Sequence, residues 1–596
     1  MRRQKRSRGL EGAERPLPIP FPKRSSVEIS LGAQAFLALL PILLAGILLV
    51  GFRVPAKWAM PAVYVAAVAV GVGVWQMEWV RVAAASIQGL FLTFDLLFII
   101  FGALLLLHTL EGSGGVAAIR RSFHAISDDR RVQIVLLGWL FGSFIEGASG
   151  FGTPAAVCAP LMVAMGFPAA AAVMIGMMIQ STAVTFGAVG TPVLVGVAGG
   201  VGGAAFDAQM ALAGLEMRDF LRLVASRVVV LHAIAGTLMP TLMVVMTTRF
   251  FGEKKSWTEG LSIFPFALLG GLAFTVPYTL TGIFLGPEFP SLLGAPVGLI
   301  IMTVAARKGF LVPKDRWDFP EADRWPKDWV SGLEVKEGGE AEARHISTAS
   351  AWSPYLLLAV LLVLSRLPQL PFGAWLRFPE VRWDSIMGTD ISALSTPFYL
   401  PGFILVLAVA ATYFLHRMRW PAMKKAVVDS SRVLLGAGFV LVFTVPMVRV
   451  YINSGQNGAG FLSMPIAMAD WVAINVGQVW PFFAPVTGAM GAFIAGSNTV
   501  SNLMFSAFQY GVADRLMISG VMIVALQAVG AAAGNMIAIH NVVAASATVG
   551  LLGREGATLR KTILPTIYYL AVIGVLGLLA VHVLRIGDPL LAVMMR

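Results

Sequence analysis

Two glycine-rich interruptions inside apolar segments carry the residue types best suited to hold a small anion. Residues 142–150 read GSFIEGASG, and residues 491–499 read GAFIAGSNT, 349 positions later. Non-helical backbone at membrane depth is tolerated only where it is buried in protein or lines a cavity. Each interruption frees N–H groups at a half-helix N-terminus, which bears roughly half a positive charge and suits a carboxylate.

A second matched pair follows the first. Residues 176–192 read GMMIQSTAVTFGAVGTP, and residues 520–536 read GVMIVALQAVGAAAGNM, at an offset of 344. Paired, glycine-interrupted segments in two halves are the best sequence indication of a secondary transporter's binding site. The alternative, ordinary small-residue packing, is disfavoured by two matched pairs. The expected substrate-binding residues are Ser149, Gly150, Thr153, Gly190, Thr191, Ser497, Asn498, Thr499, Asn535 and His540.

A charged group at membrane depth is expected to have a functional role, because its insertion at the centre of a span costs roughly 2.5–3.5 kcal/mol of free energy. Glu146, in the first interruption, is the expected proton carrier, since burial favours the protonated form of a carboxyl group. Its alternative role is a cap or hydrogen bond at the hairpin tip. The second interruption has Ala495 at the matching position, so the repeat itself does not need the acid.

Other polar groups within apolar segments are weaker candidates for a functional role. Asp95 is expected to relay protons or to pair with a neighbouring helix. Arg449 can meet a carboxylate bidentately, or its side chain can extend to the interface. His232 can titrate in the physiological range or serve only in packing. Arg227 and Gln180 are minor candidates.

Composition places these residues in a membrane protein. The chain is 57% hydrophobic and 13% charged, whereas soluble domains carry about 25% charge. Its single cysteine excludes an intramolecular disulfide and disfavours a Cys-based metal site. Neither a Walker A motif nor a metal-spaced His/Cys cluster is present, so we expect a non-enzyme without a cofactor. We interpret the net charge of +12 as a sign of the chain's orientation in the membrane and of contact with anionic lipids, rather than of nucleic-acid binding.

The expected fold is all-α and polytopic, with about 12–14 membrane segments. Two regions, 131–201 and 479–551, are apolar but broken, and we expect each to form a re-entrant hairpin followed by one broken crossing helix. The full-length candidate spans, of about 20 apolar residues, are 33–52, 58–77, 83–110, 220–247, 261–283, 292–306, 352–366, 399–416, 433–452 and 565–586.

Loop charge predicts that the two repeats are inverted. Basic loops mark the cytoplasmic side, and 120–131 is basic whereas 453–478 is poor in Lys and Arg. The two hairpins therefore enter from opposite sides. Three early spans then place the basic N-terminal tail outside, against the charge rule. The expected divisions are 1–30 disordered tail, 31–250 first repeat, 251–306 connecting helices, 307–350 cytoplasmic linker and 351–596 second repeat.

The chain resembles the lactate permease family at these same residues. The resembling strings are FIEGASGFGTPAAVCAPLMVAMGFP (144–168), FGAVGTP (186–192), GAMGAFIAGSNTVSNLMF (488–505) and VGLLGREG (549–556). The resemblance implies proton-coupled import of lactate or a short 2-hydroxy acid such as glycolate across the prokaryotic inner membrane. The SNT tripeptide is similar to that of a wider ion-transporter superfamily, which implies inverted repeats and an elevator-like movement.

One departure from the family pattern bears on the substrate. Where better-known members carry Gly-Lys and then Ser-Pro-Gln, this chain reads GNMIAIHN, with Asn535 and His540 in place of Lys and Gln. Two alternatives remain: a sodium-coupled carrier of a dicarboxylate or other organic anion, and a membrane-embedded enzyme of lipid metabolism. Homo-oligomerisation is possible. The expected partners are a small organic anion, protons and the lipid bilayer.

Overall fold

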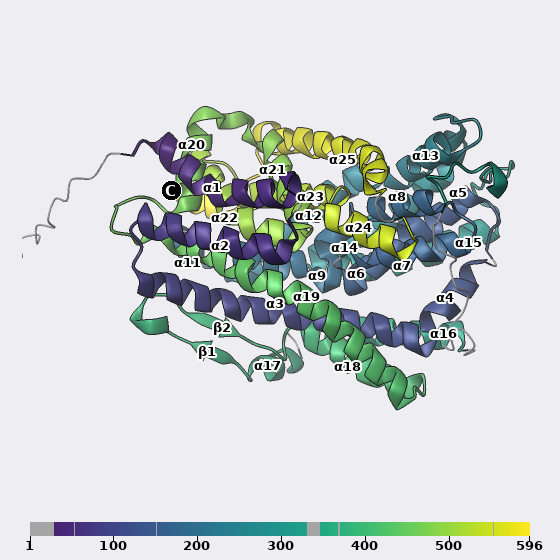
Figure 1. The fold of residues 1–596 in the computed structure, drawn as a ribbon, viewed down its shortest axis with the longest axis horizontal. Helices are drawn as coiled ribbons and strands as arrows, with labels where there is room; N and C mark the ends of the chain where they lie inside the picture. The colour runs from purple at the N-terminus through teal and green to yellow at the C-terminus, as the bar shows by residue number, and fades with distance from the viewer. Residues whose placement is uncertain are drawn as a thin grey trace, which may run out of the picture.

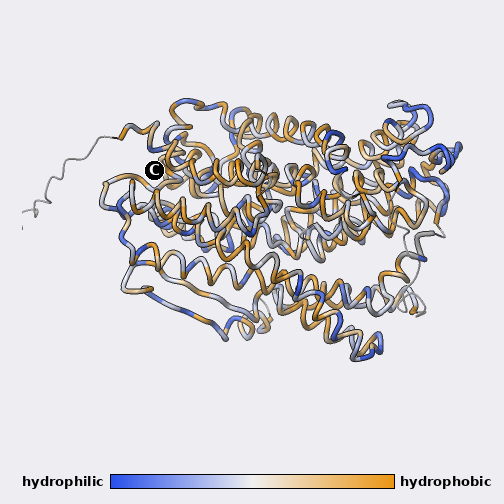
Figure 2. Tube along the Cα trace, viewed as in Figure 1, coloured by the Kyte–Doolittle hydropathy of each residue, from blue (hydrophilic) through white to orange (hydrophobic). Residues whose placement is uncertain are grey.

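Helices form almost the whole of the computed structural model, which describes residues 29–595 apart from 53, 125, 151, 331–345, 367–369 and 552–553. The predicted disordered tail lies almost entirely outside the described residues. Nine helices among the described residues are long and apolar enough to cross a membrane. Apolar residues follow their whole length, and polar residues gather at the two ends (Figure 2). The prediction of an all-α polytopic membrane protein is confirmed.

The first half contains the helices up to α15. They are α1 (Leu31–Gly46), α2 (Ala56–Gly73), α3 (Trp79–Ser113), α4 (Gly115–His124), α5 (Arg130–Gln133), α6 (Gly142–Ser149), α7 (Thr153–Ala164), α8 (Ala169–Ile179), α9 (Gly187–Thr191), α10 (Ala198–Gly200), α11 (Ala204–Ala213), α12 (Met217–Gly236), α13 (Met239–Phe251), α14 (Phe264–Phe284) and α15 (Pro290–Arg307). Two π-helical stretches, Ile134–Phe141 and Pro192–Val197, continue α5 into α6 and α9 into α10.

The second half contains the remaining helices and the two short strands. They are α16 (Thr348–Arg366), α17 (Phe372–Arg377), β1 (Val381–Trp383), β2 (Ala393–Ser395), α18 (Pro401–Leu415), α19 (Trp420–Ile452), α20 (Met464–Asn475), α21 (Trp480–Ala495), α22 (Asn498–Leu516), α23 (Gly520–Asn535), α24 (Ile539–Thr548), α25 (Glu555–Leu578) and α26 (Pro589–Met594).

Three elements differ from the sequence expectation. The span predicted at 220–247 is two helices, because Pro240 sits in the first turn of α13 and begins a new helix. The span predicted at 433–452 begins earlier, at Trp420. The polar residues that precede the apolar stretch are also helical and form the first part of α19. The connection between the spans predicted at 352–366 and 399–416 contains the antiparallel pair β1–β2, in register Val381↔Ser395.

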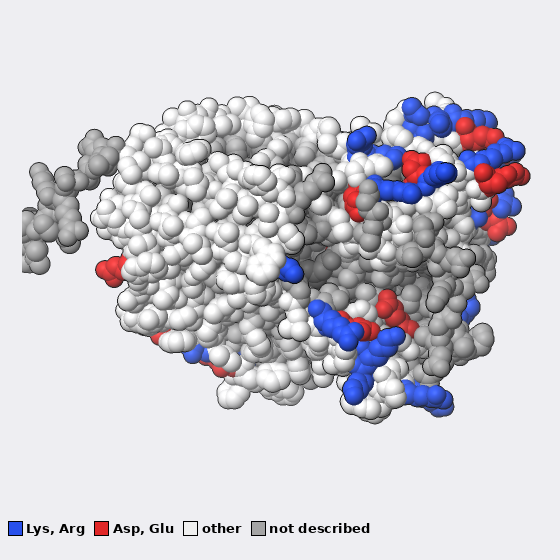
Figure 3. Space-filling model, viewed as in Figure 1, with Lys and Arg blue, Asp and Glu red and all other residues white. Residues whose placement is uncertain are grey.

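The two broken regions enter from opposite ends of the molecule. α5 and α20, which precede the two hairpins, lie at opposite ends of the long axis (Figure 1). Lys, Arg, Asp and Glu gather at the end where α5, α13 and α15 lie, and the rest of the visible face is largely uncharged (Figure 3). By the positive-inside rule we expect this charged end to face the cytoplasm. α1 begins at the opposite end of the molecule.

Proline and glycine set the path of the first hairpin. α7 begins with Thr153-Pro154, and it ends at a turn in which Gly166 has φ +92°. Pro168 then precedes α8, where its fixed φ suits a helix start. In the second half, a Cβ on Gly534 would lie 2.2 Å from the Ala489 carbonyl oxygen, so α21 and α23 approach closely. Both hairpins are thereby packed against their crossing helices.

The segment after α15 is docked on the protein rather than extended. Trp317, Phe319 and Trp329 are buried. Arg131 at the base of the first hairpin pairs with Asp129 at 2.7 Å and with Asp315 at 3.1 Å. The described part of the predicted 307–350 linker therefore packs against the charged end of the molecule, at the base of the first hairpin.

Candidate functional site

The four interruptions converge on one cavity of about 20 Å³, named here the central cavity. A cavity of this size has room for about one water molecule, so its polar lining is closely packed in this conformation. No residue of α1–α3 or of α18 and α19 lines it. Its lining residues are Glu146, Gly150, Val184, Gly187, Ala188, Pro192, Gly496, Ser497, Asn498, Thr499 and Asn535.

The first hairpin tip is closed by its own hydroxyl groups. The Ser149 and Thr153 hydroxyl oxygens lie 2.5 Å apart, and Thr153 donates to the Gly150 carbonyl at 2.7 Å. Gly150 has φ +61°, and a Cβ there would lie 2.8 Å from the Ala188 nitrogen. Gly150 therefore lines the cavity as predicted, whereas Ser149 and Thr153 stabilise the tip and do not line it.

The second tip presents a helix N-terminus to the cavity. Gly496 has φ +70°, and the Ser497 hydroxyl accepts a hydrogen bond from the Val500 N–H at 3.4 Å, so Ser497 caps α22. Asn498 donates to the Thr185 hydroxyl and the Ala528 carbonyl, both at 3.3 Å. The predicted residues Ser497, Asn498 and Thr499 all line the cavity.

The first crossing helix is interrupted over a longer stretch than the sequence indicates. The binding residues predicted in this region are Gly190 and Thr191, but α8 already ends at Ile179, and a 3-10 turn covers Ala183–Phe186. Ala188 and Val189 adopt left-handed backbone, with φ +42° and +57°. This conformation is rare for residues with a Cβ, so the backbone of this segment is strained.

Gly190 and Thr191 lie at this break but do not line the central cavity. A Cβ on Gly190 would lie 2.3 Å from the Pro287 carbonyl oxygen, so that position packs against the start of α15. The Thr191 hydroxyl donates to the Ala188 carbonyl at 2.6 Å. Both residues shape the break.

The second crossing helix is interrupted only at residues 536–538, between α23 and α24. Asn535, the last residue of α23, lines the cavity and donates its amide to the Gln180 side-chain oxygen at 3.2 Å. Its own side-chain oxygen is buried and has no hydrogen-bond partner among the described residues. The side chain of His540 lies outside the described residues.

Glu146 is the single acid in the lining of the central cavity. Its side chain is fully buried, and neither carboxyl oxygen has a hydrogen-bond partner within the described part of the chain. A Cβ on Gly187 would lie 2.5 Å from Oε1, so the carboxyl group rests against the break in the first crossing helix. The alternative that Glu146 bonds the tip backbone through its side chain is not what the structure shows.

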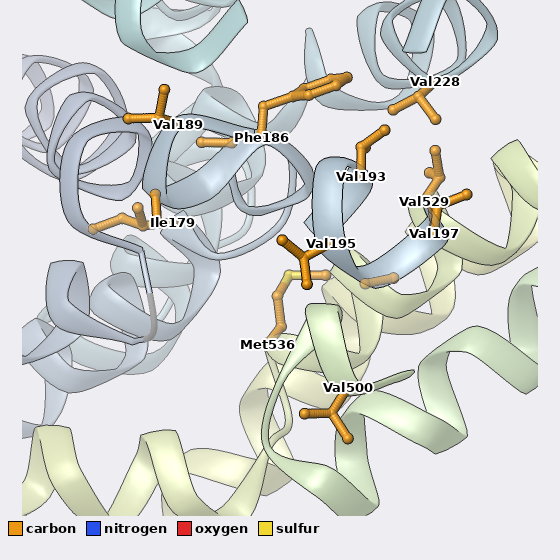
Figure 4. Close-up of a cluster of buried hydrophobic side chains, with 14 of the residues drawn as sticks. Ile179, Phe186, Val189, Val193, Val195, Val197, Val228, Val500, Val529 and Met536 are labelled. Carbon is orange, nitrogen blue, oxygen red and sulfur yellow. The ribbon is translucent and has the colours of Figure 1, made fainter. Parts of the chain in front are cut away.

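Apolar side chains surround the broken helix. Phe186, Val189, Val193 and Val197 cluster with residues of α12 and α23 (Figure 4). Such a wall excludes water from the polar groups of the cavity, which strengthens their electrostatic interactions. Among the described residues, no group of three or more His, Cys, Asp and Glu side chains fits a metal ion.

Asp95 and Arg449 lie away from the central cavity. They line a second cavity of about 230 Å³, named here the outer cavity. Asp95 accepts a hydrogen bond from Ser395, and Arg449 donates to the Gln88 side chain at 2.8 Å and to the Gly199 carbonyl at 3.0 Å. Arg449 therefore does not extend to the interface, and its contacts hold it inside the protein.

His232 belongs to a buried network that the sequence gave little reason to expect. Its Nε2 lies 2.8 Å from the Thr185 hydroxyl, and its Nδ1 lies 2.5 Å from the Tyr569 hydroxyl. Thr185 in turn accepts from Asn498. His232 thus contacts the second hairpin tip indirectly, through Thr185 and Asn498. Val184 and Ala188 also line the cavity, and no signal in the sequence distinguished them from packing residues.

Inverted broken helices around a small polar cavity are typical of polytopic membrane transport proteins. Comparison with known proteins narrows the class. A family model described as L-lactate permease matches residues 34–584, and the chain belongs to that family. It is a multi-pass protein of the bacterial inner membrane.

Individual relatives match almost end to end. A homologue from Haemophilus influenzae is 29% identical over 91% of this chain and 97% of its own length. The glycolate permease GlcA of Escherichia coli is 26% identical over 93% of this chain and 96% of its own length. The L-lactate permease of Salmonella typhimurium is 26% identical over 92% of this chain and 96% of its own length.

One solved structure is more distantly similar. The Alcanivorax borkumensis YdaH transporter is matched at 15% identity with a TM-score of 0.37, over 83% of this chain and 86% of that one. A likeness at this level defines neither fold nor function.

Proposed function

We propose that this chain imports lactate or a related short 2-hydroxy monocarboxylate by proton symport, with an elevator-like movement. The names of the family and of the relatives, L-lactate and glycolate permeases, support the substrate class. One observation carries the coupling. An acid whose carboxyl oxygens have no partner among the described residues, Glu146, shares a cavity with the N-terminus of α22.

The substrate carboxylate binds at the start of α22. The first N–H groups of a helix have no intrahelical acceptor and bear partial positive charge. Residues Ser497, Asn498 and Thr499 place these groups in the cavity. The cavity lining includes no Lys or Arg, so this N-terminus is its main positive element.

The 2-hydroxyl group of the substrate binds at Asn535. The buried side-chain oxygen of Asn535 accepts no hydrogen bond from any described residue. A hydroxyl donor satisfies this oxygen, and an unsubstituted acid leaves it unpaired at a cost of about 1–3 kcal/mol. This contact favours 2-hydroxy acids over unsubstituted acids of the same length.

Glu146 carries the coupled proton. An ionised carboxylate that is buried without a partner is very costly, so it neutralises instead. In the closed site, a protonated Glu146 also avoids repulsion with the substrate carboxylate. The anion therefore crosses together with one proton on Glu146.

The hairpins and broken helices carry the site as a unit. All lining residues of the central cavity come from the two broken regions, 131–201 and 479–551, and none comes from α1–α3, α18 or α19. Movement of these regions past the long helices α3 and α19 exposes the site to each side in turn. This arrangement supports the elevator-like movement.

Uptake in proteoliposomes tests the proposal. Labelled lactate accumulates when the outside is acidic, and a sodium gradient without a pH gradient has no effect. Competition distinguishes the substrate: glycolate inhibits strongly and succinate weakly. Sodium-driven uptake, or stronger inhibition by succinate or malate, instead identifies a sodium-coupled dicarboxylate carrier.

A further inference from the structure

The outer cavity adjoins the central cavity on the side of the β1–β2 segment. Its walls include Leu194 and Val195 of the π-helical stretch Pro192–Val197, whose first residue, Pro192, lines the central cavity. One short helical segment therefore separates the two cavities. The outer cavity is also lined by Ser392 and Leu394 of the β1–β2 segment, which lies on the side opposite the charged end (Figure 1).

The β1–β2 segment is attached to α3 along the rim of this cavity. Arg81 pairs with Asp390 at 2.5 Å, and the Gln88 side-chain amide donates to the Ser392 carbonyl at 2.8 Å. Asp95 accepts from the Ser395 hydroxyl, about two turns of α3 further in. Three polar contacts thus hold the segment over the cavity as a cover.

Arg449 supplies the positive charge of the outer cavity. Its Nε donates to the Gln88 side-chain oxygen and its Nη1 to the Gly199 carbonyl. Its Nη2 donates to no described residue. Asp207 of α11 interacts with it electrostatically but shares no hydrogen bond with it in the described structure. An arginine fixed on one edge with a remaining donor suits a carboxylate.

Gln88 joins this arginine to the cover. Its side-chain oxygen accepts from Arg449 Nε, and its amide donates to the carbonyl of Ser392. A ligand that draws the guanidinium toward itself therefore also strains the attachment of the β1–β2 segment. Anion binding and opening of the cover share one side chain.

We propose that the outer cavity is a second binding site, in which Arg449 holds a short carboxylate anion beneath the β1–β2 cover before it reaches the central cavity. This inference rests on the proposed function for the identity of the anion. Asp95, which also lines the outer cavity and accepts from Ser395, repels a second carboxylate group and so favours monocarboxylates. The site acts only on the outer face.

Cysteine modification tests this site directly, because the single native cysteine, Cys158, is buried and gives little background. Ser392→Cys and Leu394→Cys place a thiol on the outer cavity, and Val381→Cys in β1 is the matched control outside its lining. The probe is an anionic methanethiosulfonate added to outward-facing vesicles. We expect lactate to slow modification at least threefold at 392 and 394 and to leave 381 unchanged.

Two further variants separate this site from the central one. Arg449→Gln removes the protection and lowers the rate of the anionic probe relative to a cationic one, whereas Glu146→Gln blocks coupled uptake but keeps the protection. Protection that survives Arg449→Gln, that is lost with Glu146→Gln, or that is equal at 381 overturns the second site. Absence of both protection and lactate uptake in the unaltered chain overturns the proposed function, and the second site with it.

Discussion

The side-chain amide of Asn535 donates to the side-chain oxygen of Gln180 at 3.2 Å, which joins the interruptions of the two crossing helices. Asn541 donates to the same oxygen at 2.8 Å. Gln180 stands where α8 ends, and Asn535 is the last residue of α23. One glutamine therefore satisfies two buried amides from the opposite repeat, and it couples the two halves of the site.

Gln180→Leu tests this coupling. The variant leaves the amides of Asn535 and Asn541 without their shared acceptor, and a buried unsatisfied group costs about 1–3 kcal/mol. We expect a loss of stability of this size in chemical unfolding in detergent, together with weaker substrate binding. Gln478→Leu is the control, because Gln478 is exposed on the surface and should change stability little. Equal stability of the two variants would contradict the role of Gln180.

Gly187→Ala tests the contact between the first break and the acid. A Cβ at this position would lie 2.5 Å from Glu146 Oε1, and overpacking of this kind costs about 1–3 kcal/mol. We expect uptake to fall about tenfold or more. Gly73→Ala, where a Cβ meets nothing within 4 Å, should leave uptake unchanged. Normal uptake by the Gly187 variant would show that the carboxyl group does not rest there during transport.

Ser497→Ala tests the anion-binding helix N-terminus. Loss of the cap costs roughly 1 kcal/mol, and it also frees the first turn of α22 beside the substrate carboxylate. We expect KM for lactate to rise severalfold. Ser519→Ala is the matched control, because Ser519 caps α23 at the end far from the cavity. Its loss should lower stability without changing KM. The same rise in KM from both variants would remove the specific role of α22.

Asp390→Asn tests the attachment of the outer cover. The hydrogen bond from the Arg81 guanidinium lowers the pKa of Asp390 below 3.8, so the pair is intact above that pKa and is lost only as pH falls through it. We expect the rate of modification of Ser392→Cys, divided by that of Val381→Cys at the same pH to remove the change in thiolate fraction, to be independent of pH between about 5 and 8, and higher in the Asp390→Asn background at every pH. A ratio that changes with pH in this range would show that another group controls the cover.

Much of the fold followed from pattern alone. Apolar length located the spans, and the recurrence of glycine-rich breaks located both tips and both crossing helices. Loop charge gave their opposite orientation, because Lys and Arg mark one side. The site was predicted less completely. Gly150, Asn498 and Asn535 line the cavity, but Ser149 and Thr153 bond to each other instead.

The remainder depends on contacts between distant segments. The break at Gln180 contains no glycine or proline, and contacts with distant residues hold it. Asn535 and Asn541 donate to Gln180, and Tyr278 and Ser291 donate to the carbonyls of Thr182 and Ala183. His232 is bonded by Thr185 and Tyr569, which lie 47 residues before it and 337 residues after it in the chain. The sequence predicted that Arg449 binds a carboxylate or extends to the interface, whereas its hydrogen-bond partners lie on α3 and α10. Local periodicity carries no information about such pairs.

Lactate flux through Glu146→Gln is the most direct test of the central claim, that Glu146 carries the coupled proton. Purified protein in liposomes is assayed twice: for accumulation of labelled lactate driven by an inward proton gradient, and for exchange of lactate at equal pH. The account predicts that the variant loses accumulation and retains a substantial part of exchange, because the amide keeps the shape of the site but carries no proton. Proton-driven accumulation by the variant, or equal loss of accumulation and exchange, would contradict it.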